Sequence, residues 1–487
     1  MFFYPLSVDY RLISWIFLRL LALIYIFAFA SMAVQIEGLI GTHGILPIEV
    51  KLQELSNVIP NKKYWFFPSV FWFSASDSAL LWVCYFGVIS ATSLFIDRAN
   101  SVSLFVCYIL YLSIAFAGQD FTDFQWDGLL LEVGFLAIFL TWGSGWIVFL
   151  YRFLLARFMF MSGVVKLASG DPNWSGLTAL NYYYQTQPLP SSLAWYAYHL
   201  PQWFHELSVL GVFFIELMVP VLMLIPGKFR SLVALCFVIL QLFIILTGNY
   251  GFFNFLVIIL CLFLFNDGDV TPFLSQNMVK HIYLRRRCPG SKAHISAVFF
   301  TAVVLMVCAV DVWQASTRKQ VLQPLAMLQQ TVKHLSIINS YGPFAVMTTI
   351  RREIIIEGSN DGNIWFPYHF KYKPGNVKKA LTWVAPHQPR LDWLMWFQAL
   401  DKRPAPHGWF ISFIKRIKEG SPQVTALLAS NPFPTTPPNY VRALIYQYRF
   451  TTPQERKING QIWQSNTPGI YWTEFYSQNS LKSAHSP

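Results

Sequence analysis

Nine apolar segments, separated by short polar stretches, most restrict what this chain can fold into. They cover residues 12–34, 78–96, 102–118, 128–142, 146–165, 207–226, 231–248, 252–266 and 295–313. A helix of about 20 apolar residues spans the hydrocarbon core of a bilayer. Only 12% of the residues are charged, against roughly 25% in soluble proteins. We therefore predict an α-helical polytopic membrane bundle over residues 1–313, with about nine spans.

From residue 314 onward the composition becomes that of a soluble domain. A strand at 352–357 runs into the turn formers Asn360, Asp361 and Gly362, and alternating residues resume at 365–373, which predicts a hairpin. Further segments predict short amphipathic helices at 390–400, 407–419 and 423–430, and strands at 440–451 and 469–476. We expect residues 314–487 to form a soluble β-sandwich-like α+β domain with a helical insertion.

The positive charges predict an orientation in the membrane. Much of the net charge of +12 lies in one loop between two apolar segments, at Lys280, Arg285, Arg286, Arg287 and Lys292. Loops rich in Lys and Arg stay in the cytoplasm. This places the N-terminus in the cytoplasm and, with an odd number of spans, the β-rich domain outside; an even number would reverse the latter. The sequence lacks the basic, aromatic-lined groove pattern of proteins that bind nucleic acid, so nucleic acid is not an expected partner.

Six polar residues near or within the apolar segments form a candidate polar chamber. They are Asp127, Glu132, Arg152, Arg157, Lys166 and Glu216. Charged groups within a membrane are costly and normally have a partner or face water. At 1.5 Å per residue, Glu132 lies about 6 Å below the outer helix ends, Arg157 about 12 Å and Glu216 about 14 Å. Arg157 is therefore expected to pair with one or both carboxylates, either to fix helix register or to build a chamber open to the outer face.

An outer loop rich in aromatic and amide side chains follows the fifth segment. Its candidate residues either line a site beneath it or cap the bundle: Asp171, Trp174, Tyr182, Tyr184, Gln185 and Gln187. His199 and His205 lack the i,i+4 spacing of a helical metal pair, so no metal site is predicted. Nucleophile-elbow, P-loop and dinucleotide-binding motifs are missing, and neither a cofactor nor catalytic residues can be named.

Several motifs, kept in order along nearly the whole chain, resemble the lipase maturation factor family. They include Phe124–Asp127 with Leu129–Glu132, Ser169–Pro172, Thr186–Pro190, Phe214–Leu217, Thr247–Asn254, Asn339–Gly342, Ile356–Gly362 and Val384–Trp393. The resemblance adds an outer-domain motif made of Asn339, Tyr341, Glu357, Asn360, Asp361, His387, Arg390, Asp392 and Trp393. Tyr183 and Gln185 depart from it, because the family pattern has His and Glu at these two positions.

The resemblance implies a multi-pass membrane factor that assists the maturation of secreted proteins such as lipases. The wider superfamily includes the membrane domain of the vitamin K-dependent carboxylase, so a second hypothesis is an intramembrane enzyme acting on a lipid, a quinone-like molecule or a client side chain. A third is a structural assembly subunit. The expected partners are the bilayer and a client protein.

The cysteines bear on the compartment. Five lie in apolar segments and Cys288 lies in the basic loop, so the outer regions have no disulfide framework. This favours a bacterial inner membrane, in a bacterial-type member of the family, over the endoplasmic reticulum of a eukaryote. The first apolar segment lacks a small-residue cleavage site and is interpreted as a retained helix.

Overall fold

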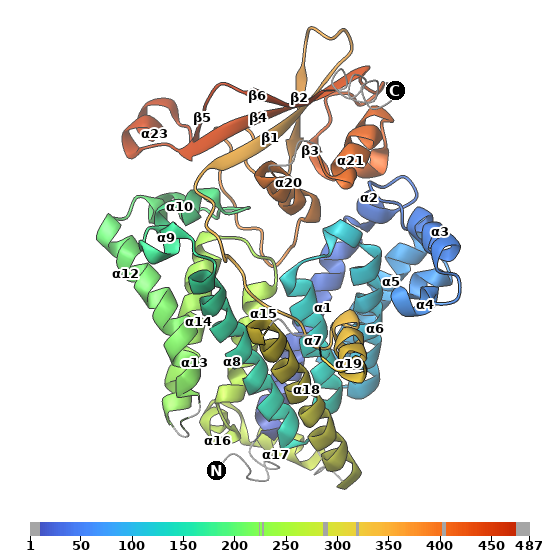
Figure 1. Ribbon diagram of the computed structural model, residues 1–487, viewed down its shortest axis with the longest axis vertical. Helices are drawn as coiled ribbons and strands as arrows, with labels where there is room; N and C mark the ends of the chain where they lie inside the picture. Colours follow the sequence, from blue (N-terminus) through green and yellow to red (C-terminus); the bar gives the residue numbers. More distant parts are fainter. Residues whose placement is uncertain are drawn as a thin grey trace.

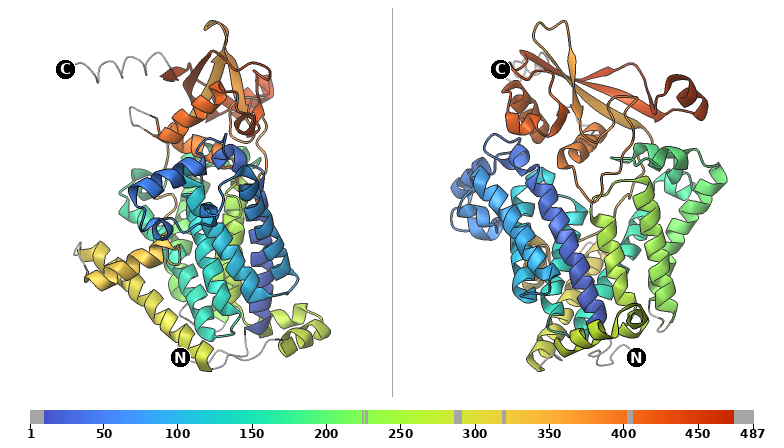
Figure 2. Two further views of the ribbon diagram at one scale, coloured as in Figure 1. Left: turned by 90° about the vertical axis from the view of Figure 1, so that its right-hand side faces the viewer. Right: turned by 180° about the vertical axis from the view of Figure 1, so that it is seen from behind.

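The computed structural model describes residues 10–223, 225, 228–285, 291–317, 321–401 and 406–473. Long helices form a bundle, and a sheet with its own helices lies at one end of that bundle (Figure 1). α1 begins at the opposite end, beside α16 and α17, as the further views also show (Figure 2). The predicted order of an α-helical membrane bundle followed by a soluble α+β domain is confirmed.

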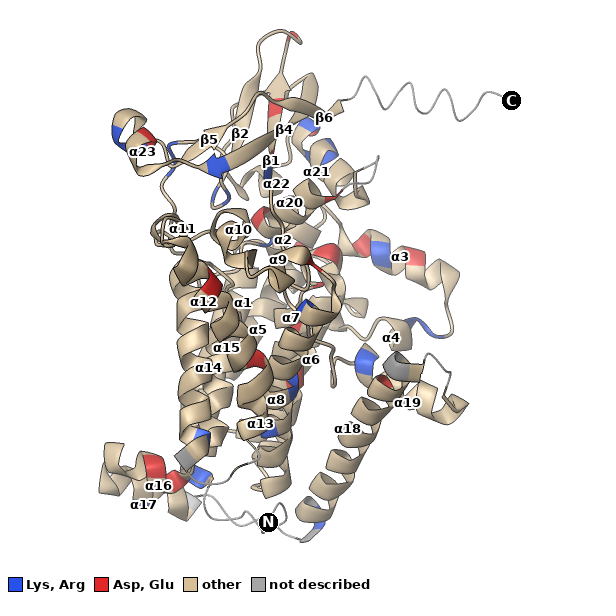
Figure 3. Ribbon diagram, turned by 60° about the vertical axis from the view of Figure 1, so that its left-hand side comes forward, with Lys and Arg blue, Asp and Glu red and all other residues tan. Residues whose placement is uncertain are grey.

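Seven helices of the described chain are long and apolar enough to cross a bilayer. They are α1 (Arg11–Ala33), α5 (Asp77–Phe95), α6 (Asn100–Ala117), α8 (Gly145–Ala168), the run of α12 (Gln202–Phe213), η3 (Phe214–Met218) and α13 (Val219–Leu222), α14 (Lys228–Thr247) and α18 (Ser291–Thr317). Figure 3 shows few charged residues along these helices, as expected for segments in contact with lipid.

Two of the nine predicted segments fall short of a full span. α7 (Gln125–Leu140) has 16 residues, most of them buried by the other helices. α15 (Phe253–Leu260) continues through η4 (Cys261–Leu264) and then bends by 109° into α16 (Asp267–Val270) and η5 (Thr271–Phe273). The described chain therefore has seven candidate spans, or eight if the bent pair counts as one.

The bend after α15 places the Asp267 side chain at the N-terminus of α1. The Asp267 carboxylate accepts hydrogen bonds from the backbone N–H groups of Arg11, Leu12 and Ile13 at 2.8–3.0 Å. These are among the N–H groups that a helix N-terminus leaves without an intrahelical partner. A side chain more than 250 residues away thus caps the first helix.

Shorter helices surround the bundle. They are α2 (Ile36–Ile40), α3 (Ile48–Val58), α4 (Lys63–Phe66), η1 (Val70–Trp72), η2 (Gln119–Phe121), α9 (Pro172–Ser175), α10 (Ala179–Thr186), α11 (Ala194–Tyr198), α17 (Gln276–Arg285) and α19 (Gln323–His334). The five described cysteines are free. Cys288, Arg286 and Arg287 of the predicted basic loop lie outside the described residues.

The sheet domain at the end of the bundle covers residues 351–473 and is called the outer domain here, after its predicted location. It contains one antiparallel sheet in the order β3-β2-β1-β4-β5, with β6 also paired to β4. Its strands are β1 (Arg351–Ser359), β2 (Phe366–Phe370), β3 (Leu428–Ser430), β4 (Tyr440–Phe450), β5 (Trp463–Ser465) and β6 (Gly469–Thr473). The predicted hairpin is β1–β2. Its turn forms because Asp361 accepts bonds from two N–H groups and Gly362 adopts a positive φ of 74°.

Helices, rather than a second sheet, form the second layer of this domain. α20 (Arg390–Leu400) packs against β1, and α21 (Gly408–Lys418) packs against β4. Two further helices are α22 (Pro422–Thr425) and α23 (Pro453–Asn459). The α21 helix has an apolar stripe that includes Phe410, Phe413 and Ile417, all buried. One such stripe can cover a sheet face and remove the need for a second sheet.

Buried polar contacts dock the outer domain onto the bundle. Arg351 on β1 is 1% exposed and donates to the carbonyl oxygens of Gln185, Gln187 and Pro188 at 2.5–3.0 Å. Its Nη2 also lies 2.6 Å from the Glu353 carboxylate. A buried guanidinium must be fully hydrogen-bonded to be tolerated, so these contacts define one docking position.

Candidate functional site

Glu132 on α7 is buried in the bundle and holds three partners. Arg157 on α8 pairs with its Oε1 atom. Its Oε2 atom accepts hydrogen bonds from the backbone N–H of Asn339 at 2.9 Å and the hydroxyl of Tyr341 at 2.7 Å. The predicted pairing of Arg157 with a buried carboxylate is confirmed for Glu132, and the carboxylate is fully enclosed by donors.

Asn339 and Tyr341 belong to a segment of residues 337–347, here called the strap. The strap runs from α19 along the bundle before β1 begins (Figure 1). Both residues belong to the predicted outer-domain motif, and their hydrogen bonds are to Gly128 and Glu132 of α7 in the bundle. Asn339 also donates to the carbonyl of Gly128 at 3.0 Å, and a Cβ at Gly128 would lie 3.3 Å from its side chain. The glycine therefore lets the strap approach the helix.

Lys166 on α8 and Glu216 form a second buried ion pair. The Lys166 Nζ lies 2.9 and 2.8 Å from the two carboxylate oxygens and 3.1 Å from the carbonyl of Ser162. Glu216 is carried by η3, a single π-helical turn between α12 and α13. Such turns occur often at functional sites, because they shift one residue out of the regular helical position. Glu216 thus pairs with Lys166, and Arg157 pairs elsewhere.

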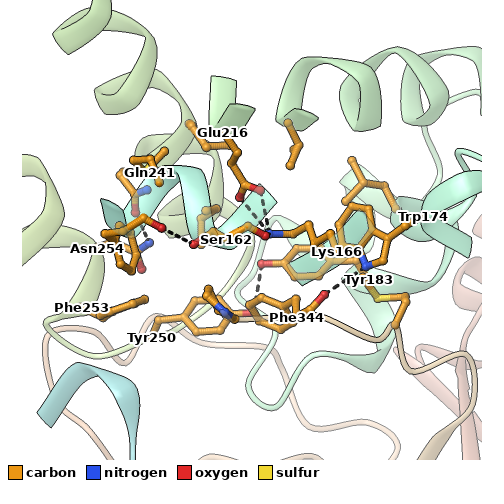
Figure 4. A pocket seen from close by; sticks show the side chains of 18 residues that line it. Ser162, Lys166, Trp174, Tyr183, Glu216, Gln241, Tyr250, Phe253, Asn254 and Phe344 are labelled. Carbon is orange, nitrogen blue, oxygen red and sulfur yellow. Dashed lines mark hydrogen bonds and ion pairs between the residues drawn. The ribbon is translucent and has the colours of Figure 1, made fainter. Parts of the chain in front are cut away.

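The Lys166–Glu216 pair lines a cavity of about 100 Å³. Its walls come from α8, the α12–α13 run, α10, α14, α15 and the strap (Figure 4). They are mostly apolar and aromatic, with Trp174, Tyr183, Tyr250, Phe253 and Phe344 prominent. Binding sites for small molecules typically combine such walls with a few polar groups.

Two polar pairs complete the cavity wall. Asn254 on α15 donates from Nδ2 to the Oε1 of Gln241 on α14 at 2.7 Å. The hydroxyls of Tyr183 and Tyr250 lie 3.0 Å apart, and Tyr250 donates onward to the Oε1 of Gln187 at 3.1 Å. The tyrosine pair is thus hydrogen-bonded to Gln187 of the predicted lining loop, while the amide pair joins α14 to α15.

Asp127 at the start of α7 does not share a chamber with the other predicted residues. It lies at the domain junction, where the bundle contacts the outer domain. Its Oδ1 atom accepts from the Nη2 of Arg390 at 2.7 Å and from the hydroxyl of Tyr111 at 2.5 Å. Arg390, the first residue of α20, also donates to the carbonyl of Phe121 at 3.1 Å. Asp127 and Arg390 are 2% exposed each. This pair therefore locks the outer domain to the bundle.

Arg152 lies away from the other five residues of the predicted chamber. Its Nε donates to the carbonyl of Phe263 at 2.7 Å, and its Nη2 donates to the hydroxyl of Tyr10 at 2.6 Å. α8 runs from the α1 start towards the outer domain, so Arg152 lies more than one turn before Arg157. The chamber predicted from sequence is therefore three separate ion pairs and one distant arginine.

Of the six candidate residues in the predicted lining loop, one lines the cavity and the other five support neighbouring segments. Trp174 lines the cavity. The Asp171 carboxylate accepts from the backbone N–H of Asn173 at 2.9 Å and that of Met347 at 2.5 Å, which fixes the strap. The backbone of Gln185 and Gln187 holds Arg351. The rings of two other members, Tyr182 and Tyr184, pack into the hydrophobic core.

The rest of the outer-domain motif stabilises the junction and the hairpin. His387 Nδ1 lies 2.8 Å from the Ser31 hydroxyl of α1. The Asp392 carboxylate accepts from the backbone N–H groups of Tyr372 and Lys373 at 2.9 and 2.8 Å. Trp393 packs on Trp126, with ring centroids 4.8 Å apart.

Three members of that motif lie in the sheet, away from the cavity. Glu357 pairs with Arg442 across β1 and β4, with Nη2 2.7 Å from Oε2. The carbonyl of Asn360 accepts from Asn439 at 2.9 Å. Asp361 closes the hairpin turn. These roles are structural.

Three residues important to these contacts are not among the candidate residues named from the sequence, although Asn249 and Asn254 fall within the motif Thr247–Asn254. Gln241 and Asn254 line the cavity, and Asn249 holds Thr382 and Val384 of the outer domain at 2.9 and 2.7 Å. A usable signal existed for Gln241, which is an uncharged polar residue in the middle of an apolar segment. In the described ranges, no group of three or more His, Cys, Asp or Glu side chains could hold a metal ion.

The fold and the buried pairs define an integral, multi-pass membrane protein whose outer domain is locked to its bundle. Residues 12–272 match the family described as lipase maturation factor transmembrane domain. Residues 337–473 match the lipase maturation factor C-terminal domain, which begins at the strap. The chain belongs to the lipase maturation factor family.

Individual relatives agree with this assignment. Lipase maturation factor 2 of Xenopus laevis is 32% identical over 579 residues, which covers 93% of this chain and 81% of the relative. The protein of the same name in Homo sapiens is 32% identical, with 97% and 83% covered. Lipase maturation factor 1 of Bos taurus is 30% identical, with 95% and 89% covered. No solved structure matches the chain.

The junction histidine predicts a dependence of stability on pH. Burial, helped by the charges of Arg390 and Lys371, lowers the pKa of His387 to about 4 in the folded protein. The unfolded chain takes up a proton near pH 6.5. The contribution of the neutral histidine is therefore complete above pH 6.5 and is lost as the pH falls towards 4, with about 2 kcal/mol lost by pH 5.

This dependence can be measured by thermal unfolding in detergent at pH 7.5 and pH 5. His387→Gln should reduce the difference in melting temperature between the two conditions, because the amide does not titrate. An equal difference in the wild type and in the variant would contradict the assignment to His387.

Proposed function

We propose that this protein is a membrane maturation factor that assists the folding or assembly of secreted lipases. The observation that carries the proposal is the relationship to proteins named lipase maturation factor, which extends through both the bundle and the outer domain. The buried Asp127–Arg390 and Arg351 contacts support a function of the two parts as one unit. The client is a secreted lipase that meets the outer domain as it folds.

The charge pairing supports a structural role for the ion pairs in this function. Asp127, Glu132 and Glu216 each already have a cationic partner. Ion pairs of this kind position elements relative to one another. The bundle then serves as the rigid base that holds the outer domain at the membrane surface.

We place the protein in the membrane that secreted proteins cross, with the start of α1 facing the cytoplasm and the outer domain facing the other side. Lys280 and Lys292 flank the loop at the α1 end, which supports this orientation. The cysteine-free outer region favours a bacterial inner membrane over the endoplasmic reticulum. Protease digestion of sealed vesicles checks the orientation, and cleavage of the outer domain from the cytoplasmic side would reverse it.

The function is tested by secreting a lipase from cells with and without this protein. We expect the activity per amount of lipase to fall without the protein, while lipase synthesis and the activity of an unrelated secreted phosphatase stay unchanged. Arg351→Met should reproduce the loss, because it undocks the outer domain. Arg352→Met, which changes a neighbouring and partly exposed arginine, is the matched control. Equal lipase activity with and without the protein would refute the proposal.

A further inference from the structure

The cavity wall presents one unused hydrogen-bond donor and one unused acceptor. Gln241 and Asn254 share a single hydrogen bond, which leaves the Gln241 Nε2 and the Asn254 Oδ1 without a partner among the described residues. The two side chains are 4% and 3% exposed, and both line the cavity (Figure 4). A buried polar group without a partner costs stability, so an occupant that satisfies both atoms would be favoured.

The charged groups of the cavity do not call for a charged occupant. The three protons of the Lys166 ammonium point to the two oxygens of Glu216 and to the carbonyl of Ser162. The pair is neutral overall, and a third charge in this apolar site would lack a counter-ion. The occupant is therefore uncharged.

Two backbone irregularities occur at the wall of the same cavity. The π-helical turn η3 brings Glu216 to it. Phe344 of the strap has φ = 57°, which is rare for a bulky residue, and its carbonyl accepts from the Trp174 Nε1 at 3.0 Å. Unusual backbone conformations of this kind concentrate at binding sites, where the surroundings hold them.

The size and the position of the cavity limit the occupant further. A volume of about 100 Å³ holds roughly three waters, and it is smaller than the 150 Å³ engineered cavity that binds benzene. Val212 on α12 and Ile244 on α14 line it and are partly exposed. Their neighbours Leu210 and Phe243 are 50% and 59% exposed on the outside of the bundle. The part of the cavity wall formed by Val212 and Ile244 therefore faces the hydrocarbon of the bilayer.

We propose that this cavity binds an uncharged hydroxyl compound. Its hydroxyl oxygen accepts a hydrogen bond from Gln241 and its proton is donated to Asn254, which one O–H group can do at once. Its apolar part extends towards α12 and α14. A diacylglycerol of the bilayer and a free short alcohol share this chemistry. The site goes beyond the maturation of lipases and does not depend on it.

The test uses the full-length protein, purified in detergent and stripped of lipid. One arm compares 1,2-dioleoylglycerol with its 3-acetyl ester, which lacks the hydroxyl, by native mass spectrometry. The other arm compares 1-butanol with diethyl ether, an isomer without an O–H donor, by saturation-transfer NMR. We expect the hydroxyl member of at least one pair to bind saturably and at least about tenfold more tightly than its control.

Three variants assign the binding to this cavity. Gln241→Leu combined with Asn254→Leu removes both amides and should weaken the hydroxyl compound about tenfold or more. Val212→Phe fills the cavity from its wall, leaves the amides intact and should abolish binding even if the double variant is unstable. Ser162→Ala is the control, because that hydroxyl already donates to the Phe158 carbonyl at 2.7 Å.

Each result decides the proposal. Selective binding of the glycerolipid identifies the bilayer as the source, and selective binding of butanol alone identifies a free alcohol. Equal binding of each hydroxyl compound and its control, binding that survives Val212→Phe, or no binding because water alone fills the cavity would overturn the proposal.

Discussion

Replacing Arg390 with methionine is expected to lower the free energy of unfolding by about 3–5 kcal/mol, the usual effect of removing one member of a buried ion pair. Asp127 would remain 2% exposed at the junction with a carboxylate facing no cation. Tyr111 and the Phe121 carbonyl would each lose a hydrogen bond from the guanidinium. The yield of monodisperse protein should fall, and the outer domain should become sensitive to protease.

The double variant Asp127→Leu with Arg390→Met should recover part of this loss, because apolar replacement of both charges removes the stranded carboxylate. Arg442→Met is a suitable control within the same domain. Arg442 pairs with Glu357, but its side chain is 31% exposed, so its loss should cost less than about 1 kcal/mol. Melting temperatures in detergent compare the three variants. If Arg390→Met and Arg442→Met melted alike, the junction would not depend on this pair.

The parts of the fold that were predictable from sequence are those encoded locally. A long apolar run specifies a membrane helix without reference to the rest of the chain, and each of the seven candidate spans overlaps a predicted segment. The β1–β2 hairpin was predictable because Asp361 and Gly362 suit its turn. α20 and α21 followed from amphipathic spacing. In each case the signal and the structure occupy the same ten to twenty residues.

The strap shows why other parts could not be predicted. Asn339 and Tyr341 bind Glu132, more than 200 residues earlier in the chain. A short segment of polar and aromatic residues has no periodicity that would place it on a bundle. Its position depends on Gly128, which leaves room for the asparagine side chain. Contacts of this kind exist only once both elements have folded.

The sequence analysis named the charged residues of the bundle but placed them in one chamber, whereas the structure has them in separate ion pairs. Depth along a helix can be estimated from residue count, and this gave Arg157 and Glu216 similar depths. Lateral position around the bundle cannot be estimated in that way, because it depends on helix packing and, at Glu216, on a π-helical turn. Arg157 and Lys166 both lie on α8, yet they contact different neighbours. The two α8 residues of the predicted chamber that bind a carboxylate therefore belong to two separate ion pairs.

These two pairs predict a specific pattern of rescue. Arg157→Met and Lys166→Met should each destabilise the bundle by about 3–5 kcal/mol, since each leaves a buried carboxylate without its cation. Glu132→Gln should restore part of the stability of Arg157→Met, because the amide can still accept a hydrogen bond from Tyr341. Glu216→Gln should do the same for Lys166→Met. Pairs in contact are expected to show coupling energies of about 0.5–3 kcal/mol.

The exchanged combinations are the critical ones. Arg157→Met with Glu216→Gln, and Lys166→Met with Glu132→Gln, break both pairs and should be at least as unstable as either single variant. Thermal unfolding of all eight variants in the same detergent gives the coupling energies directly. If the exchanged combinations rescued as well as the matched ones, the four charges would act as one shared network. Rescue confined to the matched combinations would show that the bundle holds two independent pairs, so that Lys166 and Glu216 can be altered to study the cavity while Glu132 still anchors the strap.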